Sequence, residues 1–112
     1  MKITKVNDQQ VAETPHKVDV RKLYDHESAQ TMHITLQPGE SLKPHITPVD
    51  VFFYILEGTT DVRVGDETIS VDKDALVESP GHIVHCLSNS SDHKTRILVV
   101  KAPRPKSKST LL

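Results

Sequence analysis

Apolar residues along this chain recur at alternate positions, and no segment keeps the 3.6-residue period of an amphipathic helix. Short runs rich in β-branched residues are separated by turn residues, which is typical of an all-β sandwich or barrel. The runs that predict strands cover residues 17–24, 31–37, 51–57, 60–64, 67–71, 75–78, 83–87 and 94–101. About eight strands in a chain of 112 residues leave little room for helix.

Turn-forming residues mark the ends of these runs. Pro38-Gly39 closes the second run, Gly58 follows the third, and Gly65-Asp66 is a two-residue hairpin signal. In the last run residues 97–100 are all apolar, so both faces of that strand are apolar. It is therefore predicted to be a central strand that is covered on both sides.

Charge is nearly balanced over the whole chain but not along it. There are 14 Lys and Arg residues and 15 Asp and Glu residues, a formal charge of −1 with histidine neutral. This balance gives no electrostatic reason to expect a nucleic-acid or membrane-surface protein. Residues 101–112 hold four bases and no acid. We expect this tail, rich in proline, serine and lysine, to be extended or disordered, as a solubilising end or a partner-docking arm.

Cysteine content and hydropathy bear on the compartment. The single Cys86 excludes an intrachain disulfide and favours a reducing environment. The first residues turn polar before an apolar core could form, so no signal peptide is expected. The longest apolar run, residues 51–56, is far too short to span a membrane. The sequence predicts a cytoplasmic protein of one domain.

Two sets of residues have the spacing of known sequence motifs. Gly39, five residues, His45, one residue, Thr47, then Val51, six residues and Gly58 follow the first motif of the cupin family. That motif normally has a second histidine and a glutamate where this chain has Thr47 and Val51. The spacing therefore resembles a cupin, with two substitutions at positions that carry chemistry in the family.

The second cupin motif follows at the expected distance. Pro80, His82, His85 and Asn89 keep its spacing, with His82 at the glycine position and Gly81 displaced by one. Two motifs in the right order, inside an all-β pattern, make the resemblance fairly specific.

The resemblance implies a small jelly-roll β-barrel and a division of the chain. Residues 31–101 would form the barrel core. Residues 1–30 would contribute one or more strands that pack on the barrel or extend it, and residues 102–112 would be the basic tail. A homodimer is expected, because jelly rolls of this size leave an apolar outer sheet face to cover.

A metal site is also implied by the resemblance. The family uses two histidines and a glutamate from the first motif and one histidine from the second; His45 matches the first of these ligands and His85 the last. Imidazole suits divalent transition metals, so a Zn, Ni, Mn or Fe ion held by His45 and His85 is expected, on a weakened ligand set. The alternative is that both histidines line a polar pocket and hydrogen-bond a ligand or water.

Other side chains are candidates for the same pocket. Asp50 lies one residue before the glutamate position, where a local bulge would turn it inward, and Phe53 shares the strand face of Val51. The candidates for lining the pocket are His33, Thr47, Asp50, Val51, Phe53 and His82. The remaining histidines, His16, His26 and His93, lie in polar segments and are predicted to be solvated.

Three functions are compatible with these observations. The first is a cupin that binds a small polar metabolite, a divalent metal, or both in the barrel interior. The second is a metal-dependent enzyme with an altered ligand set, for which the resemblance suggests an oxygenase, isomerase, epimerase or decarboxylase. The third is a dimeric module that serves a larger assembly. The sequence has no phosphate-binding loop, nucleophile elbow or helix-turn-helix pattern.

Overall fold

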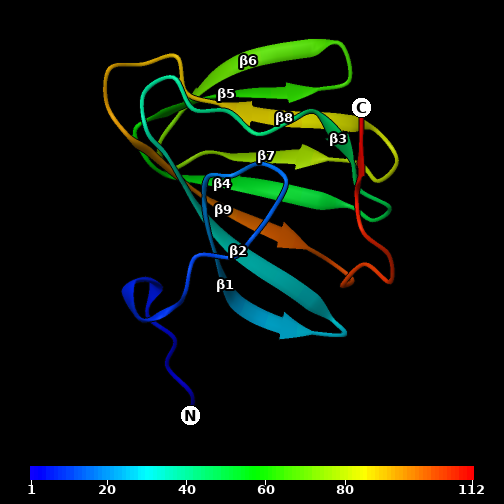
Figure 1. Ribbon diagram of the computed structural model, residues 1–112. Helices are drawn as coiled ribbons and strands as arrows, with labels where there is room; N and C mark the ends of the chain where they lie inside the picture. Colours follow the sequence, from blue (N-terminus) through cyan, green and yellow to red (C-terminus); the bar gives the residue numbers. More distant parts are fainter.

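Two five-stranded antiparallel sheets make up most of the protein, seen as a ribbon in Figure 1. The computed structural model describes all 112 residues. Its strands are β1 (Asp19–His26), β2 (Ala29–Leu36), β3 (His45–Ile46), β4 (Val51–Glu57), β5 (Thr59–Val64), β6 (Glu67–Asp72), β7 (Leu76–Ser79), β8 (Val84–Ser88), β9 (Thr95–Lys101) and β10 (Thr110–Leu111). The single helical element is a 3-10 turn, η1 (Val6–Asp8), and no helix has the length and apolar character needed to cross a membrane.

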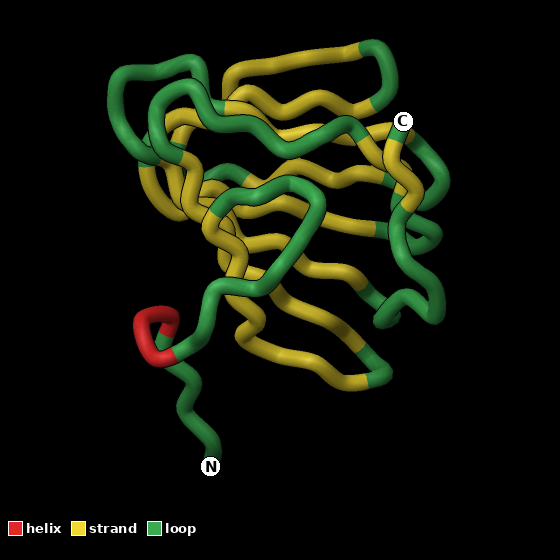
Figure 2. Tube along the Cα trace, in the orientation of Figure 1, coloured by secondary structure: helices red, strands yellow, loops and turns green.

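The strand order of the first sheet is β1-β2-β9-β4-β7, and that of the second is β10-β3-β8-β5-β6. Every sequence-predicted strand is present, and the all-β barrel fold is confirmed. Strand β9 lies between β2 and β4, which agrees with the central position predicted from its two apolar faces. The two sheets face each other (Figure 2). Residues of both sheets line the cavity described below.

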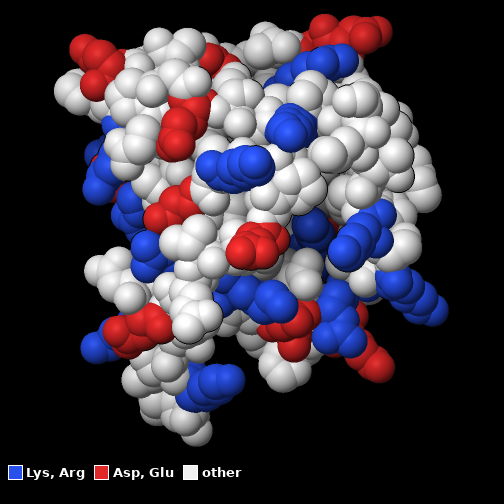
Figure 3. All heavy atoms as spheres, in the orientation of Figure 1, with Lys and Arg blue, Asp and Glu red and all other residues white.

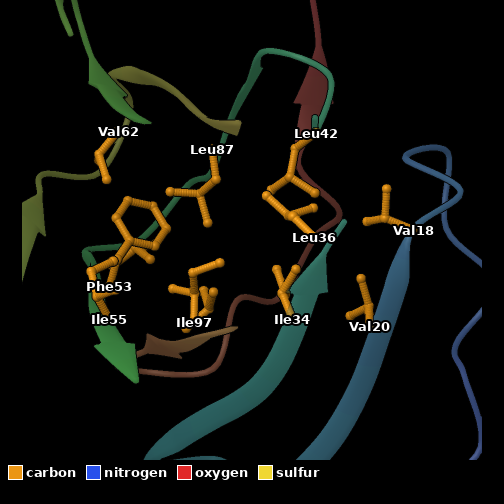
Figure 4. Close-up of a cluster of buried hydrophobic side chains, with 12 residues drawn as sticks. Val18, Val20, Ile34, Leu36, Leu42, Phe53, Ile55, Val62, Leu87 and Ile97 are labelled. Carbon is orange, nitrogen blue, oxygen red and sulfur yellow. The ribbon is translucent and has the colours of Figure 1, made fainter. Parts of the chain in front are cut away.

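The core consists of apolar side chains that point from both sheets into the space between them (Figure 4). Ile34 and Ile55 each pair in register with Ile97, which is fully buried on the central strand. Burying a side chain of this size stabilises the fold by roughly 1.5–3 kcal/mol relative to leaving it exposed. The cluster comprises Val18, Val20, Ile34, Leu36, Leu42, Val51, Phe53, Ile55, Val62, Leu87, Ile97 and Val99.

Gly58 forms the corner between β4 and β5. Its φ angle is +77°, and a Cβ atom built there would lie 2.6 Å from the carbonyl oxygen of Lys94. The corner is held from the other side by Thr95, whose hydroxyl donates a hydrogen bond to the Glu57 carbonyl at 2.9 Å. Only glycine fits this position, because it combines a left-handed backbone with a close backbone approach.

A loop near the N-terminus and the C-terminal tail both pack against the barrel. Near the N-terminus the amide of Ala12 donates to the carbonyl of Val20 at 2.7 Å. At the other end β10 pairs with β3, and the amide of Leu112 donates to the Pro44 carbonyl at 3.1 Å. The tail expected to be extended or disordered thus supplies one of the two edge strands of the second sheet, visible beside β3 in Figure 1.

Candidate functional site

A cavity of about 550 Å³ is lined by residues of both sheets, by the loop of residues 13–16 and by the C-terminal tail. Its apolar lining includes Val20, Met32, Ile34, Val51, Phe53 and Val99 on the strands, and Leu42 in the segment between β2 and β3. Its polar lining includes three histidines and a lysine, His16, His45, His85 and Lys101. The cavity therefore combines apolar and polar lining, a combination that suits small organic ligands.

His45 and His85 are paired in the polar part of the lining. They are register partners on the neighbouring strands β3 and β8, and their Nε2 atoms lie 3.1 Å apart. The Nδ1 atom of His45 is 2.8 Å from the Lys43 carbonyl, which can only accept, so this nitrogen carries a proton. In neutral His45 the Nε2 atom is then the acceptor.

The hydrogen bonds of His85 follow from that assignment. Its Nε2–H donates toward Nε2 of His45, and the Thr47 hydroxyl oxygen lies 3.0 Å from the same nitrogen. Its Nδ1 atom accepts from the Ser79 hydroxyl at 2.8 Å. The Nε2 lone pair of neutral His45 and the Nε2–H of neutral His85 are thus paired with each other at the cavity lining.

Burial keeps these imidazoles neutral. The pKa of His85 is lowered to about 4, first by burial and then by the nearby charges of His45 and Lys101. Burial also lowers the pKa of His45, an effect that its hydrogen bond to the Lys43 carbonyl opposes. At neutral pH both rings can therefore accept one proton and donate another.

His16 is a site residue that sequence reasoning missed. It was predicted to be solvated, but it is half-buried, and its ring centroid lies 4.8 Å from that of His45. Its Nδ1 atom accepts a hydrogen bond from the Lys43 amide at 2.9 Å. Its pKa is lowered to about 4, first by burial and then by His45 and Lys101. The polar segment around His16 has no hydrophobic periodicity from which its position beside His45 could have been predicted.

Lys101 is the second residue missed. It ends β9 on the same strand face as Val99, and both side chains line the cavity. Burial lowers the pKa of its ammonium group, and no carboxylate forms an ion pair with it. Alternation along β9 contained the signal, because a residue two positions after Val99 must share its face.

The donor set does not fit the metal site that the family resemblance implies. Thr47, at the position of a family histidine, bonds His85 and the Ser109 hydroxyl, and Val51, at the glutamate position, is part of the apolar wall. No group of three or more His, Cys, Asp and Glu side chains is arranged to hold an ion. The ammonium of Lys101 on the same cavity would also repel a cation.

Three of the predicted pocket residues lie elsewhere. His33 is on the outer face of β2, where its Nε2 atom accepts from Arg96 at 3.1 Å, because alternation along β2 points it away from Ile34. Asp50 is exposed and accepts from the Gly81 amide at 2.8 Å. His82 is exposed in a turn with a φ angle of +66°. His45, Thr47, Val51, Phe53 and His85 are brought together.

Residues 32–101 match the family model of the cupin domain, Cupin_2. The chain belongs to the cupin family. Residues 102–112 and the first 31 residues lie outside the match, although both segments contribute to the cavity.

Individual relatives of this cupin agree with the assignment. It is 36% identical over 78 residues to the tetracenomycin polyketide synthase protein TcmJ of Streptomyces glaucescens. That match covers 65% of this chain and 52% of TcmJ, so the chain spans about half the length of that curated relative.

Solved structures share the fold. The structure of TT1209 from Thermus thermophilus superposes with a TM-score of 0.80 at 30% identity, over 94% of this chain and 100% of that one. The polyketide cyclase RemF from Streptomyces resistomycificus superposes with a TM-score of 0.84 at 20% identity. That match covers 100% of this chain and 85% of RemF.

Proposed function

We propose that this cupin binds a small ketone-bearing molecule in the cavity between its sheets and catalyses ring closure by moving protons on it. The observation that carries the proposal is the pair of neutral imidazoles, His45 and His85, whose Nε2 atoms meet at 3.1 Å beside an apolar cavity. Support comes also from two similar proteins, one named a polyketide cyclase and one a polyketide synthase protein.

The chemistry needs one base and one acid at the same place. In an intramolecular aldol reaction a base removes a proton from the carbon beside a carbonyl group. That carbon then attacks a second carbonyl carbon of the same chain, and an acid protonates the carbonyl oxygen. Loss of water afterwards gives an unsaturated ring. No oxidant or reductant is required.

The two histidines supply these roles in this proposal. His45 is the base. Its Nδ1–H is held on the Lys43 carbonyl, and its Nε2 lone pair, which accepts from His85 Nε2–H, is freed when a ligand carbonyl takes over the His85 proton donor. His85 is the acid through its Nε2–H, and the Ser79 hydroxyl on Nδ1 fixes the required tautomer. The proton that His45 takes up then passes to Nε2 of His85 across the 3.1 Å contact, so both rings return to their neutral forms. Because the methylene between two carbonyls is a comparatively strong carbon acid, a base of lowered pKa suffices to deprotonate it.

Ring closure of the linear triketo acid 3,5,7-trioxooctanoate to 2,4-dihydroxy-6-methylbenzoate tests the proposal. The wild type should accelerate product formation, followed by liquid chromatography, and His45→Gln or His85→Gln should lower the rate by about 10²-fold or more. His93→Gln is the matched control, because the His93 side chain is 85% exposed. Absence of acceleration by folded wild type would refute catalysis, and absence of product binding as well would refute the site.

A further inference from the structure

The basic tail that stands out in the sequence lies over this cavity. Lys106 and Lys108 are exposed residues at the cavity rim, and Lys101 lies deeper, on β9. Among the residues that line the cavity, Glu13 is the single carboxylate, and it is exposed. The cavity is therefore surrounded by positive charge in a protein whose residues 1–100 carry an excess of acids.

Contacts of the tail with the barrel hold these lysines in place. The Ser109 and Thr47 hydroxyl oxygens lie 2.9 Å apart, and Thr110 pairs with Ile46 on β3. Arg104 anchors the start of the segment through its amide, which donates to the Glu27 carbonyl at 3.1 Å. Several Lys and Arg side chains line the side of the molecule along which this segment runs (Figure 3).

Lys101 is the group that needs a partner. Other partly buried bases form ion pairs, such as Arg21 with Asp19 and Arg96 with Glu57. Lys101 has no ion pair and donates no side-chain hydrogen bond, although burial lowers the pKa of its ammonium. Partial burial of an ammonium that has no protein partner is unfavourable, so a ligand that supplies a negative charge would be bound selectively.

We propose that the cavity selects ligands that carry a carboxylate group, with Lys101 as the specificity residue that contacts it and Lys106 and Lys108 as attracting charges at the rim. The inference rests on the proposed function, since it names the class of ketone-bearing molecule that would enter. A keto acid bound in this way has its carboxylate on Lys101 and its carbon chain along the apolar wall. The carbonyl groups then face the histidine pair.

Two probes that differ by one charge test the inference, namely 2,4-dihydroxy-6-methylbenzoate and its methyl ester, titrated by calorimetry. The wild type should bind the acid about tenfold more tightly than the ester. Lys101→Met should abolish that preference by weakening the acid alone, whereas Lys101→Arg should keep it. Lys73→Met is the matched control, because Lys73 is exposed and distant from the cavity lining. The double variant Lys106→Met, Lys108→Met should lower the affinity for 2,4-dihydroxy-6-methylbenzoate about twofold to threefold.

The outcomes separate the two proposals. If the wild type binds neither compound, the proposed function fails, and the present inference fails with it. If the wild type binds both compounds equally, or if Lys101→Met keeps the preference for the acid, the carboxylate inference alone is overturned. Circular dichroism establishes that each variant is folded. Should Lys101→Met unfold, Lys101→Gln provides the same comparison with a polar side chain.

Discussion

His45 on β3 and His85 on β8 are direct register partners whose Nε2 atoms lie 3.1 Å apart. Two protonated imidazoles cannot occupy that arrangement without strong repulsion. The pair is therefore stable only while at least one ring is neutral, and burial keeps it so at neutral pH. This relationship determines how the protein should respond to acid.

Stability should fall between pH 6.5 and pH 4. The pKa of His85 is about 4 in the folded protein and about 6.5 in the unfolded chain, and the same holds for His16. Because the pKa of each histidine is lowered in the folded protein, its contribution to the free energy of unfolding is full above pH 6.5. Below pH 6.5 the unfolded state takes up protons first, and that contribution is lost. For buried His85 the loss is roughly 2 kcal/mol between pH 7 and pH 4.5, and it is smaller for half-buried His16, which solvent screens. Urea unfolding at the two pH values measures the difference.

The variant His85→Gln should show a shallower loss of stability over the same pH interval. Asp25 and Asp61, whose carboxyl pKa values are lowered by hydrogen bonds, contribute only at lower pH and so do not interfere. An unchanged pH dependence in His85→Gln would contradict the assignment.

Ser79 should be needed to hold His85 in its tautomer. Its buried hydroxyl donates to Nδ1 of His85 at 2.8 Å. We expect Ser79→Ala to lower the free energy of unfolding by about 1–2 kcal/mol, because a buried acceptor loses its donor. Ser28→Ala, at an exposed turn position, should have no effect. Chemical denaturation of both variants makes the comparison, and equal effects would argue against the assigned hydrogen bond.

The C-terminal segment should be required for a closed cavity but not for the barrel. Removing residues 105–112 deletes β10 and the part of the lining contributed by the tail. Far-ultraviolet circular dichroism should stay nearly unchanged, whereas the backbone amides of β3 should exchange faster with deuterium. Removal of residues 1–4, which precede η1, is the control. A global loss of protection on removing residues 105–112 would mean that the segment is part of the folding core.

Gly58 and Gly39 should differ in their tolerance of a side chain. Both have positive φ angles, but only at Gly58 would a Cβ atom meet backbone, the Lys94 carbonyl at 2.6 Å. We expect Gly39→Ala to lower the free energy of unfolding by about 1 kcal/mol, because only backbone strain is introduced. Gly58→Ala should lower the free energy of unfolding by about 3 kcal/mol or more, because the β4–β5 corner must also shift. Thermal unfolding distinguishes them, and similar melting temperatures would be evidence against a tight corner.

Restoring the family's ligands should create metal binding. Thr47 and Val51 stand where the family has histidine and glutamate, and both lie beside His85 or the cavity. The double variant Thr47→His, Val51→Glu should bind Zn²⁺ near stoichiometrically after incubation and dialysis, measured by elemental analysis. The wild type should retain far less. Stoichiometric zinc in the wild type would show that its two histidines recruit other ligands.

Short-range patterns in the sequence predicted most strands of the barrel. Alternation and turn residues located the longer strands because a pleated strand repeats every two residues. Strands β3 and β10 contain two residues each, too few for any period to be recognised. Their pairing depends on long-range contacts, which explains why the tail could not be placed from its composition.

The sequence predicted only part of the candidate site. The motif spacing found His45 and His85, and the family resemblance identified Thr47 and Val51 as the departures from it. Alternation already put His33 on the face opposite Ile34, and it put Lys101 on the face of Val99. No local pattern predicted the position of His16, because its contact with His45 joins two segments that are far apart in the sequence.

The central place of β9 also affects how the protein is made. Strands β2 and β4 do not pair with each other; each pairs with β9, which begins only at Thr95. While the ribosome is still producing residues 58–94, both earlier strands present unpaired backbone edges. The first sheet can therefore assemble only after β9 has emerged. Slow translation before Thr95 would prolong a state that is prone to aggregation.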